Sequence, residues 1–267
     1  MDPKIAAFRA LHEKGCFVLP NPWDPGSAVY LEHLGFKALA TTSAGFAFSQ
    51  ALPDAGVPLE RMLRHLEEMA AATRVPVNAD FQAGYADDPE GVARNVARCV
   101  GTGVAGLSIE DSTSAGGLYE RGLAIDRIRA ARAATGDVVL TARCEAFLLG
   151  MADAARIVLD RLPAFAEAGA DCLYAPGVRD PETIAAIVKA VAPRPVNVLV
   201  GSPGLTVAQL AALGVRRISV GGALARAAWG GFVRAAREIA AQGTFGGFAD
   251  ATPFSELEKL FSALTAA

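Results

Sequence analysis

Short apolar runs rich in β-branched residues alternate with longer segments of helical period along the whole chain of 267 residues. Runs of this length and composition predict buried parallel strands when amphipathic helices separate them. The predicted strands are Cys16–Leu19, Ala38–Thr42, Val75–Asp80, Gly106–Glu110, Val138–Arg143, Cys172–Ala175, Val196–Val200 and Arg217–Val220.

The segments between the strands carry apolar residues on one face and charged residues on the other, as helices that cover a sheet do. Three helix starts are predicted where a capping side chain precedes a proline, at Asp88-Pro89, Asp180-Pro181 and Ser202-Pro203. The predicted helices are Leu59–Thr73, Gly91–Val100, Ile125–Thr135, Ala154–Ala168, Pro181–Val191 and Val207–Leu213.

Eight alternating strand and helix units predict a (β/α)8 TIM-type barrel. A doubly wound open sheet is the alternative, but no GxGxxG motif follows the first strand. After the eighth strand, a helical segment, a Gly-rich break at 243–247 and an amphipathic stretch at 254–264 follow. We expect a single barrel domain over residues 1–267, with a C-terminal helical extension at 245–267. This extension packs either on its own barrel or on a neighbouring subunit.

Composition and charge exclude several classes of protein. Hydrophobic residues make up 52% of the chain, which is enough for a large buried core. The net charge of -3 provides no basic surface for nucleic acid or for an anionic membrane. The uncharged span 195–215 is broken by glycines and a proline, so we do not expect it to cross a membrane.

The N-terminal segment and the cysteines predict a cytoplasmic protein. The N-terminus lacks the apolar segment of a secretory signal. The four cysteines have no metal-ligand spacing and are too few for a disulfide scaffold, so we expect reduced thiols.

Charged residues end three neighbouring strands of the predicted barrel, where active sites of this fold lie. The third strand ends on Asp80, the fourth is followed by Asp111 after Glu110, and the fifth ends on Arg143, with Glu145 close behind. Acidic oxygens from neighbouring strands suit Mg²⁺, and the guanidinium of an arginine suits a carboxylate. The pattern predicts an anionic substrate held between a metal ion and Arg143.

Other chemistries find little support in the sequence. His12, His33 and His65 lie in helical segments rather than at strand ends, so a histidine base or a zinc site is not expected. No GxSxG motif is present. The segment 201–204, Gly-Ser-Pro-Gly, fits either a phosphate-binding loop or an ordinary turn.

Six motifs follow one another along the chain in a recognisable order. They are Asn21-Pro22-Trp23-Asp24 with Ser27-Ala28, Thr42-Ser43-Ala44-Gly45, Leu52-Pro53-Asp54, Val77-Asn78-Ala79-Asp80 with Gly84-Tyr85, Ser108-Ile109-Glu110-Asp111, and Thr141-Ala142-Arg143. Together they resemble the isocitrate lyase/phosphoenolpyruvate mutase superfamily over residues 12–240.

This resemblance implies a barrel that binds Mg²⁺, with Mn²⁺ as an alternative, and a small 2-oxo or 2-hydroxy acid that reacts through an enolate. Asp80 matches the metal-binding aspartate, and Asn78 stands where relatives have another Asp, which weakens the expected metal affinity. The expected metal ligands through water are Asn78, Asp54 and Glu110. The expected substrate-binding residues are Trp23, Ser43, Ala44, Gly45, Arg143 and Asn197, with Ser43–Gly45 in a loop. The expected catalytic residues are Asp54, Glu110 and Arg143. Exchange of a C-terminal helix between subunits implies a homo-oligomer, either a dimer or a tetramer.

The loop after the fourth strand departs from the relatives. Its sequence over 111–119, Asp-Ser-Thr-Ser-Ala-Gly-Gly-Leu-Tyr, is small and Gly-rich, which is typical of a lid. It lacks the Lys-Lys/Arg-Cys-Gly-His signature of isocitrate and methylisocitrate lyases, and also the Lys and Asn of phosphoenolpyruvate mutases. Cys144 lies near the rim at a different position, and we expect it to pack in the interior.

We therefore expect a Mg²⁺-dependent lyase or decarboxylase-like enzyme for a 2-oxo acid. One alternative is C–P bond chemistry, as in phosphonopyruvate hydrolase or carboxyphosphonoenolpyruvate mutase. The other is a barrel that binds a 2-oxo acid without catalysis. The carboxylates of Asp54, Asp80 and Glu110 argue against that last alternative, because binding an anion alone would not need them.

Overall fold

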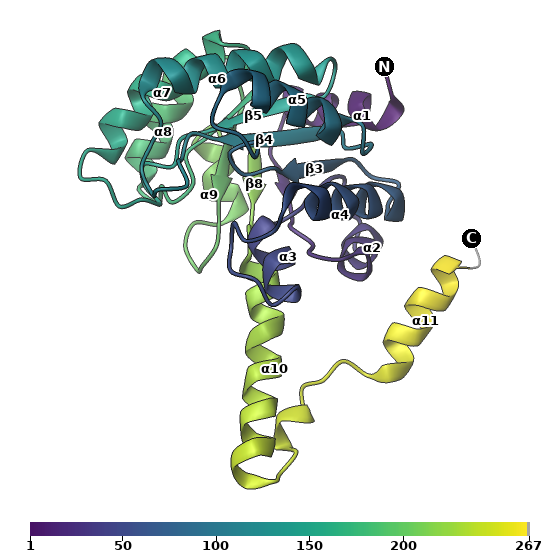
Figure 1. The fold of residues 1–267 in the computed structure, drawn as a ribbon. Helices are drawn as coiled ribbons and strands as arrows, with labels where there is room; N and C mark the ends of the chain where they lie inside the picture. Colours follow the sequence, from purple (N-terminus) through teal and green to yellow (C-terminus); the bar gives the residue numbers. More distant parts are fainter. Residues whose placement is uncertain (266–267) are drawn as a thin grey trace. The chain divides into compact units, whose positions relative to one another are not determined.

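Parallel strands with helices outside them form a barrel in the computed structural model, which describes residues 1–265 (Figure 1). The last residues of the predicted extension, 266–267, lie outside the described residues. The strands are β1 (Phe17–Leu19), β2 (Leu39–Ala40), β3 (Val77–Asp80), β4 (Gly106–Glu110), β5 (Val139–Arg143), β6 (Cys172–Tyr174), β7 (Val196–Leu199) and β8 (Arg217–Ser219).

The strands pair in the order β1-β8-β7-β6-β5-β4-β3-β2, and every pair is parallel. At the remaining seam, between β1 and β2, the Ala40 N–H donates to the Pro20 carbonyl at 3.0 Å. The barrel is thus nearly closed, and the prediction of a (β/α)8 fold is confirmed.

Alternation along the strands separates the core from the barrel interior. In β3, Val77 and Ala79 belong to the main hydrophobic core, whereas Asn78 and Asp80 line a polar cavity. In β4, Leu107 and Ile109 belong to the same core, and Ser108 and Glu110 line the cavity. The same period of two that buries each strand against the helices therefore delivers the polar side chains inward.

The predicted helices are present, and two of the three predicted starts are confirmed. The carboxylates of Asp88 and Asp180 accept the N–H groups of Gly91 and Thr183 at 2.7 and 2.8 Å. The start at Ser202 is wrong, because Thr206 caps that helix in a reciprocal pair with Gln209. The barrel helices are α1 (Pro3–Glu13), α2 (Pro25–His33), α3 (Ser43–Ser49), α4 (Leu59–Ala72), α5 (Pro89–Val100), α6 (Arg121–Thr135), α7 (Ala154–Glu167), α8 (Pro181–Val191) and α9 (Val207–Ala212).

Helix α1, of which only His12 was predicted to lie in a helical segment, fills one end of the barrel interior. Phe8 is fully buried in a cluster with Leu19, Ala40, Ala105 and Val139, residues of the strands or next to them. A Cβ atom on Gly106 would lie 2.5 Å from the Phe8 ring, so only glycine fits at the start of β4.

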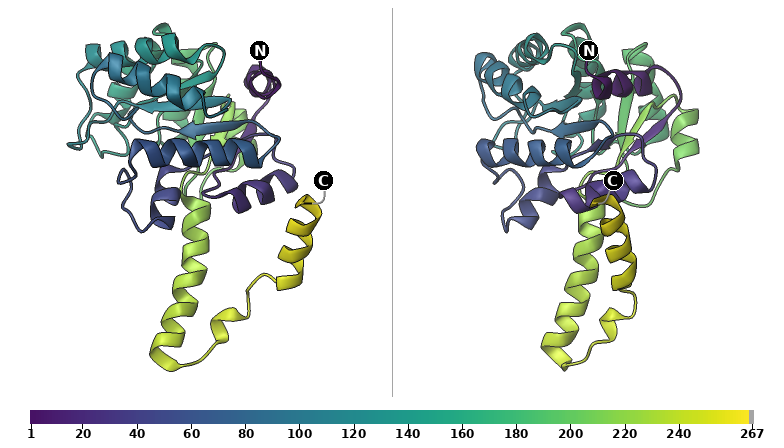
Figure 2. Two further views of the ribbon diagram at one scale, coloured as in Figure 1. Left: turned by 45° about the vertical axis from the view of Figure 1, so that its right-hand side comes forward. Right: turned by 90° about the vertical axis from the view of Figure 1, so that its right-hand side faces the viewer.

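The chain divides into two compact units, Met1–Gly222 and Ala223–Ala267. The second unit contains α10 (Ala223–Gln242), a short 3-10 helix at Gly246–Phe248 and α11 (Phe254–Thr265), and a linker joins its helices (Figure 2). Its large apolar side chains are unusually exposed, with Phe254 at 81% and Phe232 at 62%. No helix in the described part of the chain is long and apolar enough to cross a membrane.

Replacing Phe8 with Ala should lower the free energy of unfolding by about 3–5 kcal/mol, because it removes a fully buried ring and leaves a cavity. Urea unfolding followed by circular dichroism measures the change. Leu34→Ala is the control, since Leu34 is 56% exposed and should change stability by less than about 0.5 kcal/mol. Equal effects of the two substitutions would contradict the role of Phe8.

Candidate active site

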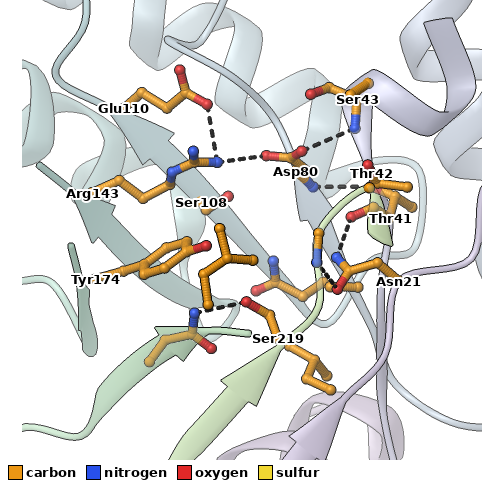
Figure 3. A pocket seen from close by; sticks show the side chains of 18 of the residues that line it. Asn21, Thr41, Thr42, Ser43, Asp80, Ser108, Glu110, Arg143, Tyr174 and Ser219 are labelled. Carbon is orange, nitrogen blue, oxygen red and sulfur yellow. Dashed lines mark hydrogen bonds and ion pairs between the residues drawn. The ribbon is translucent and has the colours of Figure 1, made fainter. Parts of the chain in front are cut away.

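A polar cavity of about 160 Å³ opens at the C-terminal ends of the strands. It brings together most of the predicted site residues, and several of them are drawn in Figure 3. The predicted residues that line it are Ser43, Ala44, Asp54, Asn78, Asp80, Glu110, Arg143 and Asn197.

Arg143 lies at the centre of this group and contacts three carboxylates. Its Nη1 lies 2.8 Å from Asp80 Oδ1 and 2.9 Å from Glu110 Oε1, and its Nε lies 2.8 Å from Glu145 Oε1. The strands β3, β4 and β5 are parallel neighbours in which Asp80 pairs with Ser108 and Glu110 with Arg143, so their C-terminal side chains meet at this rim. The guanidinium also lies over the ring of Tyr174, 5.1 Å from its centroid.

One guanidinium does not balance the negative charge of three carboxylates. Burial raises the pKa of Glu110 to about 7; Arg143 opposes this shift, whereas Glu145 and Asp80 add to it. Burial also raises the pKa of Glu145. The cluster therefore carries excess negative charge that favours either a proton or a further cation.

The first turn of α3 closes one side of the cavity. The Ser43 N–H donates to Asp80 Oδ2 at 2.9 Å, and the Ser43 hydroxyl donates to Asp54 Oδ1 at 3.2 Å. Ser43, Ala44 and Gly45 were expected in a loop; they form a helical turn instead, because the Thr42 hydroxyl caps it by accepting the Gly45 N–H. Ser43 and Ala44 line the cavity and Gly45 does not.

Two predicted substrate-binding residues are placed differently from the rest. Trp23 lies in the loop before α2, where its N–H donates to Ser27 Oγ, and it does not line the cavity. Asn197 lines the cavity, but its amide is engaged with Ser219 Oγ and Arg217 Nε, both at 2.9 Å. These contacts make Asn197 part of the cavity wall. Direct contact of Trp23 or Asn197 with a substrate stays a prediction.

Comparison with known proteins identifies the family. A family model described as phosphoenolpyruvate phosphomutase matches residues 8–240. This chain belongs to the phosphoenolpyruvate mutase family. Within the wider isocitrate lyase/phosphoenolpyruvate mutase superfamily, oxaloacetate decarboxylase of Pseudomonas aeruginosa is 33% identical over 79% of this chain and 76% of its own.

Solved structures of the superfamily are also similar to this barrel. A Burkholderia cenocepacia protein provisionally described as a lyase/mutase has a TM-score of 0.93 and 46% identity, covering 97% of this chain and 96% of its own. Phosphonopyruvate hydrolase, in a complex with oxalate and Mg²⁺, has a TM-score of 0.86 and 26% identity, covering 98% of this chain and 96% of its own.

Several cavity residues escaped the sequence analysis. Tyr174, Ser108, Ser219 and Arg217 all point inward from β4, β6 and β8. Alternation along each strand could have identified them, because every second residue of a strand points into the barrel. Arg217 and Ser219 lie two positions apart in β8, as Asn78 and Asp80 do in β3.

The donor set fits Mg²⁺ held largely through water. The cavity offers the oxygens of Asp54, Asp80 and Glu110, and Asn78 Oδ1 is a buried acceptor without a hydrogen-bond partner in the described chain. Across residues 1–265, no three acidic, His or Cys side chains are grouped closely enough to hold a metal by themselves. Few protein ligands and several waters are what Mg²⁺ prefers.

Glu110→Gln should flatten part of the pH dependence of stability, measured by urea unfolding in EDTA. A carboxyl whose pKa rises from 4.5 to about 7 on folding stabilises the protein below pH 4.5, and this stability is lost as the pH rises through 7. The variant should therefore gain stability relative to the wild type between pH 5 and pH 8. Exposed Glu67→Gln is the control; a Glu110→Gln profile parallel to the wild type would contradict the shift.

Proposed function

We propose that this protein is a Mg²⁺-dependent enzyme, with Mn²⁺ as a substitute, that cleaves a C–C bond in a small 2-oxo or 2-hydroxy acid as a lyase or decarboxylase. The observation that carries the proposal is the convergence of Asp54, Asp80, Glu110 and Arg143 on one cavity in a chain of this family. Cleavage next to a carbonyl leaves negative charge on its oxygen, and the cation supplies positive charge there when bound.

The residues of the chain divide the work around that charge. Asp80, together with Asp54, Glu110 and Asn78 through water, would hold the cation. Arg143 contacts the carboxylates of the chain through Nε and Nη1. Its Nη2 is therefore the nitrogen that can donate hydrogen bonds to a substrate carboxylate. Glu110, whose pKa lies near 7, can hold or release a proton at physiological pH.

The relatives support this reading and also define its competitor. Oxaloacetate decarboxylase and phosphonopyruvate hydrolase are both named for 2-oxo acids that carry a second acidic group. Oxalate, present in the hydrolase complex, resembles the enolate of pyruvate in shape and charge. C–P bond chemistry is the competing function, and the absence of Lys and Arg from residues 111–119 argues against it.

We also propose that the protein is a cytoplasmic homo-oligomer. Trp229 and Phe232 of α10, and Phe245, Phe248 and Phe254 after it, are between 41% and 81% exposed within one chain. Such a concentration of exposed apolar side chains is typical of surfaces that another chain covers. A second copy supplies that cover in this proposal.

Oxalate should raise the melting temperature in the presence of Mg²⁺ and much less in EDTA, because a ligand that binds the native state stabilises it. Asp80→Ala should abolish the Mg²⁺-dependent part of the shift and lower metal affinity by about 10–100-fold. Arg143→Ala should weaken oxalate binding by about tenfold or more at saturating Mg²⁺.

Exposed Asp126→Ala is the matched control for both substitutions. A full Mg²⁺-dependent shift in Asp80→Ala would contradict the metal site. Mg²⁺-dependent binding without turnover of any 2-oxo acid would favour the non-catalytic alternative, and turnover of phosphonopyruvate alone would favour C–P chemistry.

The double substitution Trp229→Glu and Phe232→Glu should convert the oligomer to monomers, because it places charges on the exposed apolar residues of α10. Light scattering coupled to size-exclusion chromatography gives the mass, and circular dichroism checks folding. A wild-type chain that elutes at 27.6 kDa would contradict the oligomer.

A further inference from the structure

A second cavity, of about 390 Å³, adjoins the active-site cavity and shares Ser43, Asp54 and Glu110 with it. We call it the outer chamber. Its other walls come from the loop after β3, with Gln82 and Tyr85, and from the loop after β4, with Ser112 and Tyr119. A substrate whose 2-oxo acid end occupies the inner cavity would extend its remaining part into this chamber.

Among residues 1–265, no cationic side chain lines the outer chamber. Neither Lys nor Arg is among the described residues that line it, whereas Asp54, Asp87 and Glu110 are. Glu110 is paired with Arg143, but no ion pair involves Asp54 or Asp87 in the described part of the chain. A carboxylate or phosphonate placed there would lie near the Asp87 carboxylate, which accepts a hydrogen bond from the Tyr119 hydroxyl at 2.5 Å but pairs with no cation, and this disfavours its binding.

Hydrogen-bonding groups are plentiful in the same chamber. The Tyr85 hydroxyl is buried and has no hydrogen-bond partner among residues 1–265. Burial raises its pKa far above the usual value, so this hydroxyl stays protonated and can donate. A buried hydroxyl without a partner is unfavourable unless a ligand or water satisfies it.

The chamber wall around Tyr85 is rigid. Gln82 and Tyr85 have φ values of +49° and +56°, which are uncommon for residues other than glycine. Buried Arg127 holds this loop by donating to the carbonyls of Ala86 and Asp87, both at 2.5 Å, and to that of Ala83. Its guanidinium also stacks on the Tyr119 ring at 3.9 Å, so the two loops are fixed together.

We propose that the outer chamber is a binding subsite for an uncharged, hydroxyl-bearing tail of the substrate, with the Tyr85 hydroxyl as a hydrogen-bond partner. The inference rests on the proposed function, since the inner cavity must hold the 2-oxo acid end. It assigns the substrate to hydroxylated 2-oxo monocarboxylates. Oxaloacetate and phosphonopyruvate both carry a second anionic group, for which the chamber provides no cation.

Three ligands of equal chain length test the assignment by calorimetry in saturating Mg²⁺. They are 5-hydroxy-2-oxopentanoate, 2-oxopentanoate and 2-oxoglutarate, which differ only in a hydroxymethyl, methyl or carboxylate end. The hydroxylated ligand should bind the wild type about tenfold more tightly than 2-oxoglutarate, because like charges repel in the chamber. It should also bind more tightly than 2-oxopentanoate.

Two substitutions in the chamber should change these ratios in different ways. Gln82→Lys puts a cation of similar length in the chamber wall and should raise the affinity for 2-oxoglutarate by about tenfold relative to the hydroxylated ligand. Tyr85→Phe should bring the ratio of hydroxylated ligand to 2-oxopentanoate close to one. Gln242→Lys, which adds the same charge in the second unit, is the control and should leave every ratio at its wild-type value.

A wild type that binds 2-oxoglutarate at least as tightly as the hydroxylated ligand overturns the subsite. So does a Gln82→Lys variant that is folded by circular dichroism and shows the wild-type ratios. If oxalate and all three ligands fail to bind with Mg²⁺, the proposed function fails instead. Oxalate binding with the wrong order among the three ligands leaves that function intact and rejects only the chamber assignment.

Discussion

The ion pairs around Arg143 are the interaction on which the rest of the site depends. Three carboxylates from adjoining strand ends can be buried together only because a guanidinium lies between them, since unpaired buried charge is strongly unfavourable. The parallel register of β3, β4 and β5 fixes where these side chains meet. The excess of carboxylate over guanidinium then favours a cation in the cavity, as the proposed function requires.

A further buried ion pair links the active-site cavity to the outer chamber. Asp111 accepts the Glu145 N–H at 2.8 Å and pairs with Arg161 of α7 at 3.0 Å. Arg161 also donates to the Tyr119 carbonyl at 2.8 Å. Asp111 therefore orients Glu145 beside Arg143, and its partner fixes the loop that forms one wall of the outer chamber. The proposed metal site and the proposed subsite for the substrate tail therefore share one support.

The sequence predicted the barrel well because hydrophobic period and strand spacing are local properties. Strand ends also located Asp80, Glu110 and Arg143 correctly at one rim, since parallel strands in a barrel all end at the same edge. What it missed depends on packing between distant residues. Nothing near Phe8 shows that it fills the barrel interior, and nothing near Tyr85 or Arg127 shows that a loop with two positive φ values encloses a chamber. Thr206 rather than Ser202 caps α9, because Thr206 and Gln209 form a reciprocal capping pair. The Ser-Pro motif did not reveal this pair.

Exchange of the methyl protons of pyruvate in deuterated water tests the central claim most directly. An enzyme that stabilises negative charge on the carbonyl oxygen of a 2-oxo acid should catalyse this exchange, which proton NMR follows without knowledge of the natural substrate. We predict exchange well above the uncatalysed rate with Mg²⁺, lost in EDTA and restored by added Mg²⁺ or Mn²⁺. Exchange no faster than in buffer, under conditions where oxalate binds, would contradict the enolate chemistry.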